Sequence, residues 1–257
     1  MQPTPSEHTR FPVVFLGAGP GDPELITLKG RRLLDQADVV VYAGSLVNVA
    51  LLDGIAAICH DSASLDLEAI MTLLAEGYRA GKRVVRLHTG DPAIYGAIRE
   101  QMQWLDRNHI PYEVVPGVSS AFAAAATLRR ELTAPEVTQT VIFTRQAGRT
   151  PVPEPERLVN LARAQATMCI FLSVSLMPQV VSDLLAGGYP PDTPVAVVER
   201  ASWPDERVLR GDLAGIAALV ADSGIRKTAM IVVGAALGDD STVVSRLYDA
   251  DFSHEYR

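Results

Sequence analysis

The sequence predicts an α/β fold of two α/β domains, the N-terminal one built on a mainly parallel sheet and the C-terminal one on a mixed sheet. Three observations lead to this prediction. Short apolar runs alternate with segments of helical spacing through the first half of the chain, a pattern typical of parallel sheets. A polar stretch at residues 132–140 interrupts the pattern. When the alternation resumes, two apolar runs are separated only by a short loop, which indicates antiparallel pairing in the second sheet.

In the first half, four β-branched or apolar runs bounded by Gly, Pro or Asp are typical of buried strands. The segments between them have helical spacing, and in one of them Ile94, Ile98, Met102 and Leu105 form a single stripe. A helix of small residues follows a Pro-Gly turn. The expected strands are residues 13–16, 39–42, 83–87 and 112–115, and the expected helices are residues 25–36, 65–80, 93–107 and 118–127.

The polar stretch contains Pro135 and three threonines, and we expect the domain boundary there. The sequence thus predicts an N-terminal domain at residues 11–131, a C-terminal domain at 138–237 and a polar, mobile tail at 238–257. In the second domain the expected strands are residues 141–143, 168–172, 194–198, 207–210 and 229–233, and the expected helices are 155–165, 176–185 and 213–221.

Composition excludes several classes of protein. Among 257 residues, 48% are hydrophobic and 21% are charged, so a disordered or fibrous chain is not expected. The chain carries 23 Lys and Arg against 30 Asp and Glu, a net charge of −7, which argues against non-specific binding to nucleic acid or to anionic lipid.

The sequence also lacks the patterns of membrane, secreted and cysteine-rich proteins. The longest stretch without charged residues, 164–182, is too polar to span a membrane, and the N-terminus has no apolar signal region, so a cytoplasmic location is expected. Cys59 and Cys169 lie far apart and outside any CxxC pattern, which excludes a disulfide framework or a zinc ribbon. Both are expected to be buried.

The first strand is followed by GAGPGD at residues 17–22, part of a dinucleotide-binding GxGxxG pattern. The match fails at its last position, where Asp22 would face a phosphate, and Pro20 removes one backbone N–H donor. A pyrophosphate site is therefore disfavoured, and a tight strand-to-helix turn is the simpler alternative. No GxxxxGK[ST] occurs, so the chain is not a P-loop hydrolase.

Two further turns follow strands, GDPAIY at residues 90–95 and PGVSSA at 116–121. An ordinary helix start would explain the first of them, with Asp91 as the cap and Pro92 as the first helical residue. The carboxyl ends of parallel strands are also where α/β sheets bind ligands, and there Asp91 would accept from a ribose hydroxyl or from a main-chain donor. Small residues in the second turn permit close backbone approach to a ligand or to a helix.

These three turns, in this order and spacing, resemble those of the tetrapyrrole methylase family, the S-adenosyl-L-methionine-dependent methyltransferases of cobalamin and siroheme biosynthesis. The resemblance covers about residues 13–234, and three longer strings narrow it to one kind of member: YAGSLVN at 42–48, TRQAGRTP at 144–151 and ASWPDE at 201–206. It implies two α/β domains with the cofactor in a cleft between them, S-adenosyl-L-homocysteine as the product, a tetrapyrrole acceptor and a homodimer.

The resemblance also implies which residues bind the cofactor. Leu172 and Ala201 differ from the residues of a relative that methylates uroporphyrinogen, so main-chain rather than side-chain contacts are expected at these two positions. The matching positions are Pro20, Gly90, Asp91, Ile94, Tyr95, Ser119 and Ser120 in the first domain and Leu172, Ala201, Thr228 and Ala229 in the second.

Methyl transfer from a sulfonium to a pyrrole carbon is a direct displacement that depends on in-line positioning, and it requires neither a nucleophilic triad nor a metal. The sequence agrees, since it has no HExxH and only five scattered histidines. His60 and His88, at strand ends, are expected to be satisfied structural residues. No single catalytic residue is predicted.

A polycarboxylate acceptor requires locally placed arginines. The candidates are Arg145 and Arg149, and more weakly Arg129 and Arg130, whose alternative role is a solvated helix end. Tyr42 and Ser45 are expected to line the macrocycle pocket. Trp203 would serve either in packing or as a platform for the ring.

Two functions of other classes remain open. A nicotinamide-dependent oxidoreductase would need glycine in place of Asp22 and an acidic residue at the end of the second strand, whereas Asp38 precedes that strand. A non-catalytic tetrapyrrole carrier would not need the three cofactor turns. Sister methylases that act on another tetrapyrrole carbon, or on a diphthamide precursor, share the cofactor loops, and the sequence does not reveal whether the acceptor carries cobalt.

Overall fold

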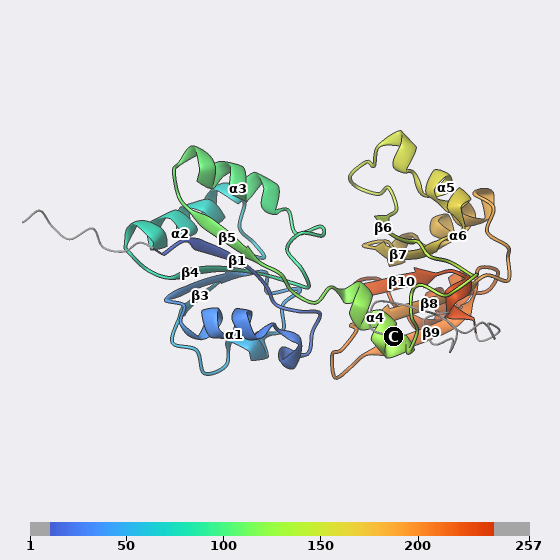
Figure 1. The fold of residues 1–257 in the computed structure, drawn as a ribbon, viewed down its shortest axis with the longest axis horizontal. Helices are drawn as coiled ribbons and strands as arrows, with labels where there is room; N and C mark the ends of the chain where they lie inside the picture. The colour runs from blue at the N-terminus through green and yellow to red at the C-terminus, as the bar shows by residue number, and fades with distance from the viewer. Residues whose placement is uncertain (1–10, 239–257) are drawn as a thin grey trace, which may run out of the picture. The chain divides into compact units, whose positions relative to one another are not determined.

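A computed structural model describes residues 11–238, and the chain divides into two compact units (Figure 1). The first unit runs to Ala123 and includes Ser202–Pro204. The second begins at Ala124, runs to Ala201 and continues from Asp205. The division falls within a helix, whereas the sequence placed the boundary in the polar stretch that follows it. Of the tail expected at 238–257, all but the first residue lie outside the described residues.

The sheet of the first unit, predicted to be mainly parallel, is parallel throughout, with strand order β3-β2-β4-β1-β5. One strand was missed. β3 is an edge strand of sequence ICHD with mostly exposed side chains, so it lacks the apolar or β-branched run by which the other strands were predicted. The strands are β1 (Val13–Gly17), β2 (Val39–Tyr42), β3 (Ile58–Asp61), β4 (Val84–His88) and β5 (Tyr112–Val115).

Alternate residues of these strands face opposite sides of the sheet. Val13 and Phe15 pack in one cluster with residues of α2 (Leu67–Arg79), while Val14 and Leu16 pack in the other with Leu34 of α1 (Leu28–Asp35). Each helix has an N-cap side chain: Thr27 Oγ1 accepts from Gly30 N at 3.0 Å and Asp66 Oδ1 from Ala69 N at 2.9 Å.

The expected helix at 93–107 begins later than predicted. α3 spans Ile98–Arg107. Residues 92–95 form a turn, and Tyr95 and Ala97, before the helix, have φ of 55° and 48°. These left-handed conformations interrupt the apolar stripe that includes Ile94, so its helical spacing was misleading.

The second unit has a mixed sheet, again as predicted, with order β6-β7-β10-β8-β9. β6 and β7 are parallel, and the remaining neighbours are antiparallel. The strands are β6 (Val141–Arg145), β7 (Thr167–Phe171), β8 (Pro194–Glu199), β9 (Arg207–Asp212) and β10 (Ala229–Val233).

α4 (Ser120–Leu128) contains the division between the units. One face of the second sheet packs on α5 (Leu158–Leu161), α6 (Met177–Ala186) and α7 (Ile216–Ser223) in a cluster that includes Ile170, Val197 and Ile231. The helix predicted at 155–165 is mostly absent. Arg157, with ψ of 142°, separates a 3₁₀ turn at Glu154–Glu156 from α5, and a second 3₁₀ turn at Ala162–Ala164 follows.

The expected burial of both cysteines is half correct. Cys169 is buried in β7, where burial raises the pKa of its thiol to about 12. The prediction for Cys59 is wrong, because it lies on the exposed edge strand β3. No helix in the described part of the chain is long and apolar enough to cross a membrane.

Candidate active site

The loops after β1 and β4 are joined backbone to backbone in the first unit. Gly90 N donates to Gly19 O at 2.8 Å, and Gly19 N donates to Gly90 O at 3.3 Å. The loop after β5 lies against both, because a Cβ atom added to Gly117 would stand 2.1 Å from Gly90 O and one added to Gly17 would stand 2.6 Å from Gly117 Cα. Glycine is therefore required at these contacts, and the three predicted turns do meet at the carboxyl edge of the sheet.

Asp91 fixes this arrangement with both carboxylate oxygens. Oδ1 accepts from Ala93 N at 2.8 Å, and Oδ2 accepts from Gly117 N at 2.9 Å. The carboxylate thus joins the loop after β4 to the loop after β5, and it caps a turn rather than the helix α3, which starts at Ile98. Of the two roles considered for it, the structure shows acceptance from main-chain donors.

The other predicted cofactor residues of these loops differ in how far they are exposed. Ile94 is half-buried and Tyr95 is exposed, the latter in the left-handed region. In the third turn Ser119 is buried, and its Oγ accepts from Ala121 N at 3.3 Å, so it begins the α4 segment, while Ser120 is half-buried. A non-glycine residue in the left-handed region costs about 1 kcal/mol, a strain often found at functional sites.

Trp203 packs against the loop after β1. Of the two roles considered for it, packing and a platform for the macrocycle, the structure shows packing. Its Nε1 donates to Pro20 O at 3.0 Å, and Ser202 Oγ accepts from Asp22 N at 3.0 Å. A Cβ atom on Gly21 would lie 2.0 Å from Trp203 Cδ1. Sequence reasoning missed a further contact, in which Asn48 Nδ2 donates to Gly21 O at 2.9 Å.

Tyr42 and Ser45 follow β2 at the same carboxyl edge. Tyr42 is half-buried and Ser45 is exposed. The connection between them is held by Asp61, whose Oδ1 accepts from Gly44 N at 2.9 Å. Both predicted pocket residues are therefore accessible to a ligand.

In the second unit, the predicted residues gather at one edge of the sheet. β10 runs antiparallel to both β7 and β8, so the start of β10 lies beside the ends of the other two. Leu172, Arg200 and Thr228 have φ of 55°, 50° and 52°, and Arg200 N donates to Thr228 O at 2.8 Å. Three left-handed non-glycine residues in one place mark this edge as a candidate site. Leu172 is 72% exposed, whereas Ala201 is buried.

The 146–151 loop follows β6 at the same end of that sheet. Arg149 is exposed and makes no hydrogen bond or ion pair with any residue in the range 11–238. Arg145 instead directs its guanidinium back to the carbonyls of its own loop, with Nη2 2.7 Å from Pro151 O. The two arginines predicted to contact the acceptor thus lie in different surroundings.

Comparison with known proteins identifies the family. The model of the tetrapyrrole (corrin/porphyrin) methylases matches residues 12–217. The chain belongs to the tetrapyrrole methylase family. It is 54% identical to a cobalt-precorrin-4 C(11)-methyltransferase of Methanocaldococcus jannaschii over 95% of both chains, and 51% identical to a precorrin-4 C(11)-methyltransferase of Pseudomonas aeruginosa over 95% of this chain and 98% of that one.

Two solved structures are similar throughout. A cobalt precorrin-4 methyltransferase superimposes with a TM-score of 0.88 at 48% identity, covering 90% of this chain and 98% of the other. A uroporphyrin-III C-methyl transferase from Thermus thermophilus, solved with S-adenosyl homocysteine, has a TM-score of 0.75 at 33% identity and covers 88% of this chain and 99% of its own.

In this tetrapyrrole methylase, His88 is buried but not satisfied, contrary to expectation. No described residue bonds to its Nε2. Burial, and to a smaller extent the charge of Arg86, lowers the pKa of His88 to about 3. The imidazole is therefore neutral near pH 7. Arg86 is also buried, and its Nη1 donates to Ser62 Oγ at 2.9 Å and to Val41 O at 3.1 Å.

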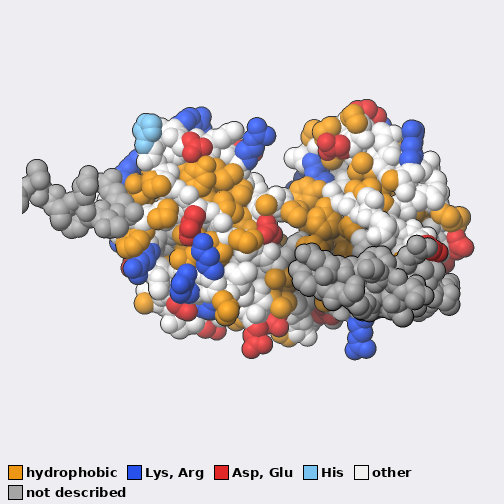
Figure 2. Space-filling model, in the orientation of Figure 1, with side chains coloured by type: hydrophobic (Ala, Val, Ile, Leu, Met, Phe, Trp, Pro, Cys, Tyr) orange, Lys and Arg blue, Asp and Glu red, His pale blue; other side chains and the backbone are white. Residues whose placement is uncertain are grey.

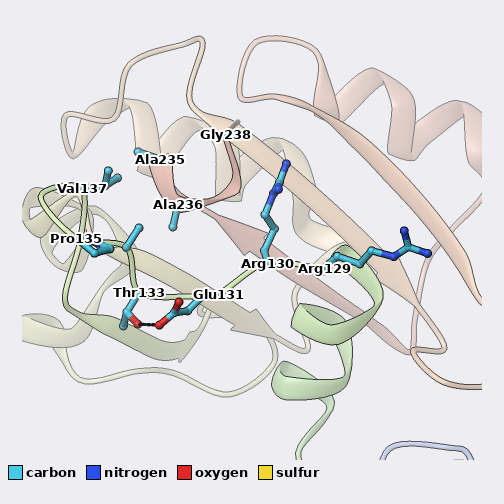
Figure 3. Close-up of a pocket in the computed structure, with 10 residues that line it drawn as sticks. Arg129, Arg130, Glu131, Thr133, Pro135, Val137, Ala235, Ala236 and Gly238 are labelled. Carbon is cyan, nitrogen blue, oxygen red and sulfur yellow. Dashed lines mark hydrogen bonds between the residues drawn. The ribbon is translucent and has the colours of Figure 1, made fainter. Parts of the chain in front are cut away.

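The weaker arginine candidates of the tetrapyrrole methylase lie elsewhere in the second unit, by a cavity of about 220 Å³ at the end of α4 (Figure 3). Arg130 Nε donates to Leu237 O at 3.0 Å. Arg129 is exposed, and Figure 3 shows its guanidinium pointing away from the other labelled residues. On the face drawn in Figure 2, the Lys and Arg of the described residues are scattered among Asp and Glu, without a broad basic surface.

Proposed function

We propose that this tetrapyrrole methylase transfers one methyl group from S-adenosyl-L-methionine to C-11 of precorrin-4, giving precorrin-5 in cobalamin biosynthesis. The proposal rests on the sequence identity of 51–54%, over nearly the full length, with two enzymes named for C-11 methylation. The cobalt form of precorrin-4 is the second candidate acceptor, because the relative with 54% identity is named for that form.

The first unit fits the cofactor through its main chain. The loops of Gly90 and Gly117 are packed so closely that side chains are excluded between them, while Ile94 and Ser120 stay partly accessible beside them. Backbone groups that can bond to hydroxyls thus lie beside an apolar side chain that can contact a ring. Such an edge suits a ligand that carries hydroxyl groups as well as an apolar ring. We propose that Pro20, Gly90, Asp91, Ile94, Tyr95, Ser119 and Ser120 hold the cofactor in this unit.

For Asp91, the two main-chain bonds favour the role of holding the loops, with the remaining lone pairs of its carboxylate free for a ribose hydroxyl. In the second unit we assign cofactor contacts to Leu172, Ala201, Thr228 and Ala229. When bound, S-adenosyl-L-methionine supplies an electrophilic methyl group. The task of the protein is to bind and orient the two substrates and to exclude water.

The acceptor carries several carboxylates, and Arg149 is a guanidinium with no described partner. We propose that Arg149 pairs with a carboxylate of the macrocycle, since a charged bidentate pair gives both strength and orientation. Tyr42 and Ser45, which are accessible after β2, complete the proposed acceptor contacts.

We infer a cytoplasmic homodimer, in line with the resemblance described above. Light scattering on the eluting peak of a size-exclusion column would test the assembly, with twice the mass of the chain expected and the mass of a single chain contradicting it.

Carbon-13 NMR of the product tests the reaction. The protein is incubated with precorrin-4 and S-adenosyl-L-methionine labelled with ¹³C in the methyl group. The expected product carries one labelled methyl bonded to C-11. A label at any other ring carbon would assign the protein to a different reaction of the same family.

A further inference from the structure

The 146–151 loop is fixed at its beginning by buried hydrogen bonds. Gln146 is 4% exposed, its backbone N donates to Ser173 Oγ at 2.8 Å, and its Nε2 donates to Asp183 Oδ2 at 2.7 Å. Ser173 is fully buried and Asp183 belongs to α6. The first residue of the loop is therefore attached to the core of the second unit.

Arg145 fixes the other end of the loop. Its Nη1 donates to Thr150 O at 3.1 Å and to Gln146 O at 3.4 Å, and its Nη2 donates to Pro151 O at 2.7 Å. A planar guanidinium offers donors in fixed directions, so it can hold several carbonyls at once, which a lysine ammonium on a flexible stem cannot reproduce.

The guanidinium of Arg149 lies on the part of the loop between these two attachments. Gly148 N donates to Thr150 O at 3.3 Å, which narrows the loop, and Arg149 stands exposed without a described partner. Because Arg145 pairs with Phe171 in the parallel register of β6 and β7, the loop begins beside the exposed Leu172. A cationic group next to an apolar side chain suits a ligand with an apolar ring and carboxylates at its rim.

We propose that Arg145 is a positioning residue that acts through Arg149: its guanidinium holds the 146–151 loop in the conformation in which Arg149 meets an acceptor carboxylate. The inference rests on the proposed function and replaces the direct acceptor contact expected for Arg145. The advantage is that the loop is ordered before the acceptor binds, so binding does not have to supply the cost of ordering it.

The test is a double-mutant cycle on the full-length protein. Arg145→Lys keeps the charge and loses the planar donors, and Arg149→Gln removes the free cation. We expect each change alone to raise KM for precorrin-4 about tenfold, with the affinity for S-adenosyl-L-homocysteine within about twofold of the unmodified protein. In the double variant KM should be no higher than in Arg149→Gln alone, because Arg145 has nothing left to position. Additive effects would overturn the proposal, since they would mean that Arg145 meets the acceptor independently.

Hydrogen exchange of the backbone amides at 147–150 gives a second readout that needs no activity. Arg145→Lys should speed exchange there several-fold and leave α6 unchanged, whereas Arg149→Gln should leave the loop as it is. Arg163→Lys is the matched control, because Arg163 is exposed in the same unit. Equal exchange in Arg145→Lys and the control would overturn the proposal. If Arg145→Lys does not fold, Arg145→Gln takes its place in both measurements.

The two proposals fail in different ways. If the unmodified protein methylates precorrin-4 but Arg149→Gln does not change KM, the positioning role is wrong and the function stands. If the unmodified protein methylates neither form of precorrin-4, the function and the acceptor part of the inference both fall, while the exchange data still decide whether Arg145 orders the loop.

Discussion

Asp91 is the single residue on which the first unit's loops depend most directly, since its carboxylate accepts from backbone donors of two loops. A hydrogen bond to a charged group contributes about 1.5–3 kcal/mol. We therefore expect Asp91→Ala to lower the affinity for S-adenosyl-L-homocysteine about tenfold or more, with an unchanged far-UV circular dichroism spectrum. Calorimetric titration measures the affinity, and a value equal to that of the unmodified protein would show that the loops do not need this carboxylate.

His88 gives the fold a dependence on pH. Its pKa is about 3 in the folded protein and about 6.5 when exposed in an unfolded chain. The folded state therefore binds fewer protons between these values, so the stability contributed by neutral His88 is complete above about pH 6.5 and is lost as the pH falls towards 3.

We expect the free energy of unfolding to fall between pH 6.5 and 5 by up to about 1.4 kcal/mol per pH unit on account of this group. In His88→Gln that part of the slope should disappear. Urea unfolding of both proteins at several pH values measures it. Identical slopes in the two proteins would mean that His88 binds its proton as readily in the folded protein as in the unfolded chain.

The loops after β1, β4 and β5 meet so closely that glycine is required where backbone touches backbone. In Gly117→Ala the new Cβ would stand 2.1 Å from Gly90 O, so the loops must separate. We expect a loss of at least about 2 kcal/mol in the free energy of unfolding together with weaker binding of S-adenosyl-L-homocysteine.

Gly54→Ala is the matched control for Gly117→Ala. Nothing lies within 4 Å of its added Cβ, and its φ of 77° costs only about 1 kcal/mol. Both variants are compared by urea unfolding and by calorimetry. If Gly117→Ala bound the ligand as tightly as Gly54→Ala, the close approach of the loops would not matter for the site.

Strands with a local apolar or β-branched signal could be predicted from the sequence. β2, β5 and β10 have the predicted bounds, although only β2 and β10 are largely buried, whereas β5 lies at a sheet edge and buries only Val115. β3 gave no such signal, because ICHD at an exposed edge carries few apolar contacts. The start of α3 could not be found either, since Tyr95 and Ala97 are ordinary helix residues whose left-handed conformations are imposed by their surroundings.

The site shows the same limit. The three turns after strands could be recognised from Gly, Pro and Asp, whose backbone roles are specific. The contacts of Trp203 with Pro20 and of Asn48 with Gly21 join residues 183 and 27 positions apart, so they follow only from the folded arrangement. The same holds for Arg145, because nothing in TRQAGRTP shows which arginine turns back to the loop and which remains free.

For the whole molecule, the acidic balance and the acidic acceptor have to be reconciled. A net charge of −7 repels a polycarboxylate at long range, and screening in physiological salt reduces this repulsion beyond about 8 Å. Binding must then come from a few placed cations at short range, the role proposed for Arg149. This arrangement favours selectivity for the position of carboxylates over general attraction to anions.

Mass spectrometry of methyl transfer distinguishes the possible acceptors of the methyl group. Uroporphyrinogen III, precorrin-4 and cobalt-precorrin-4, each generated in place by upstream enzymes, are offered with S-adenosyl-L-methionine. We predict the gain of one methyl group on precorrin-4 or on its cobalt form and none on uroporphyrinogen III. Methylation of uroporphyrinogen III, or of no acceptor while S-adenosyl-L-homocysteine still binds, would contradict the proposed function and leave the family and the fold in place.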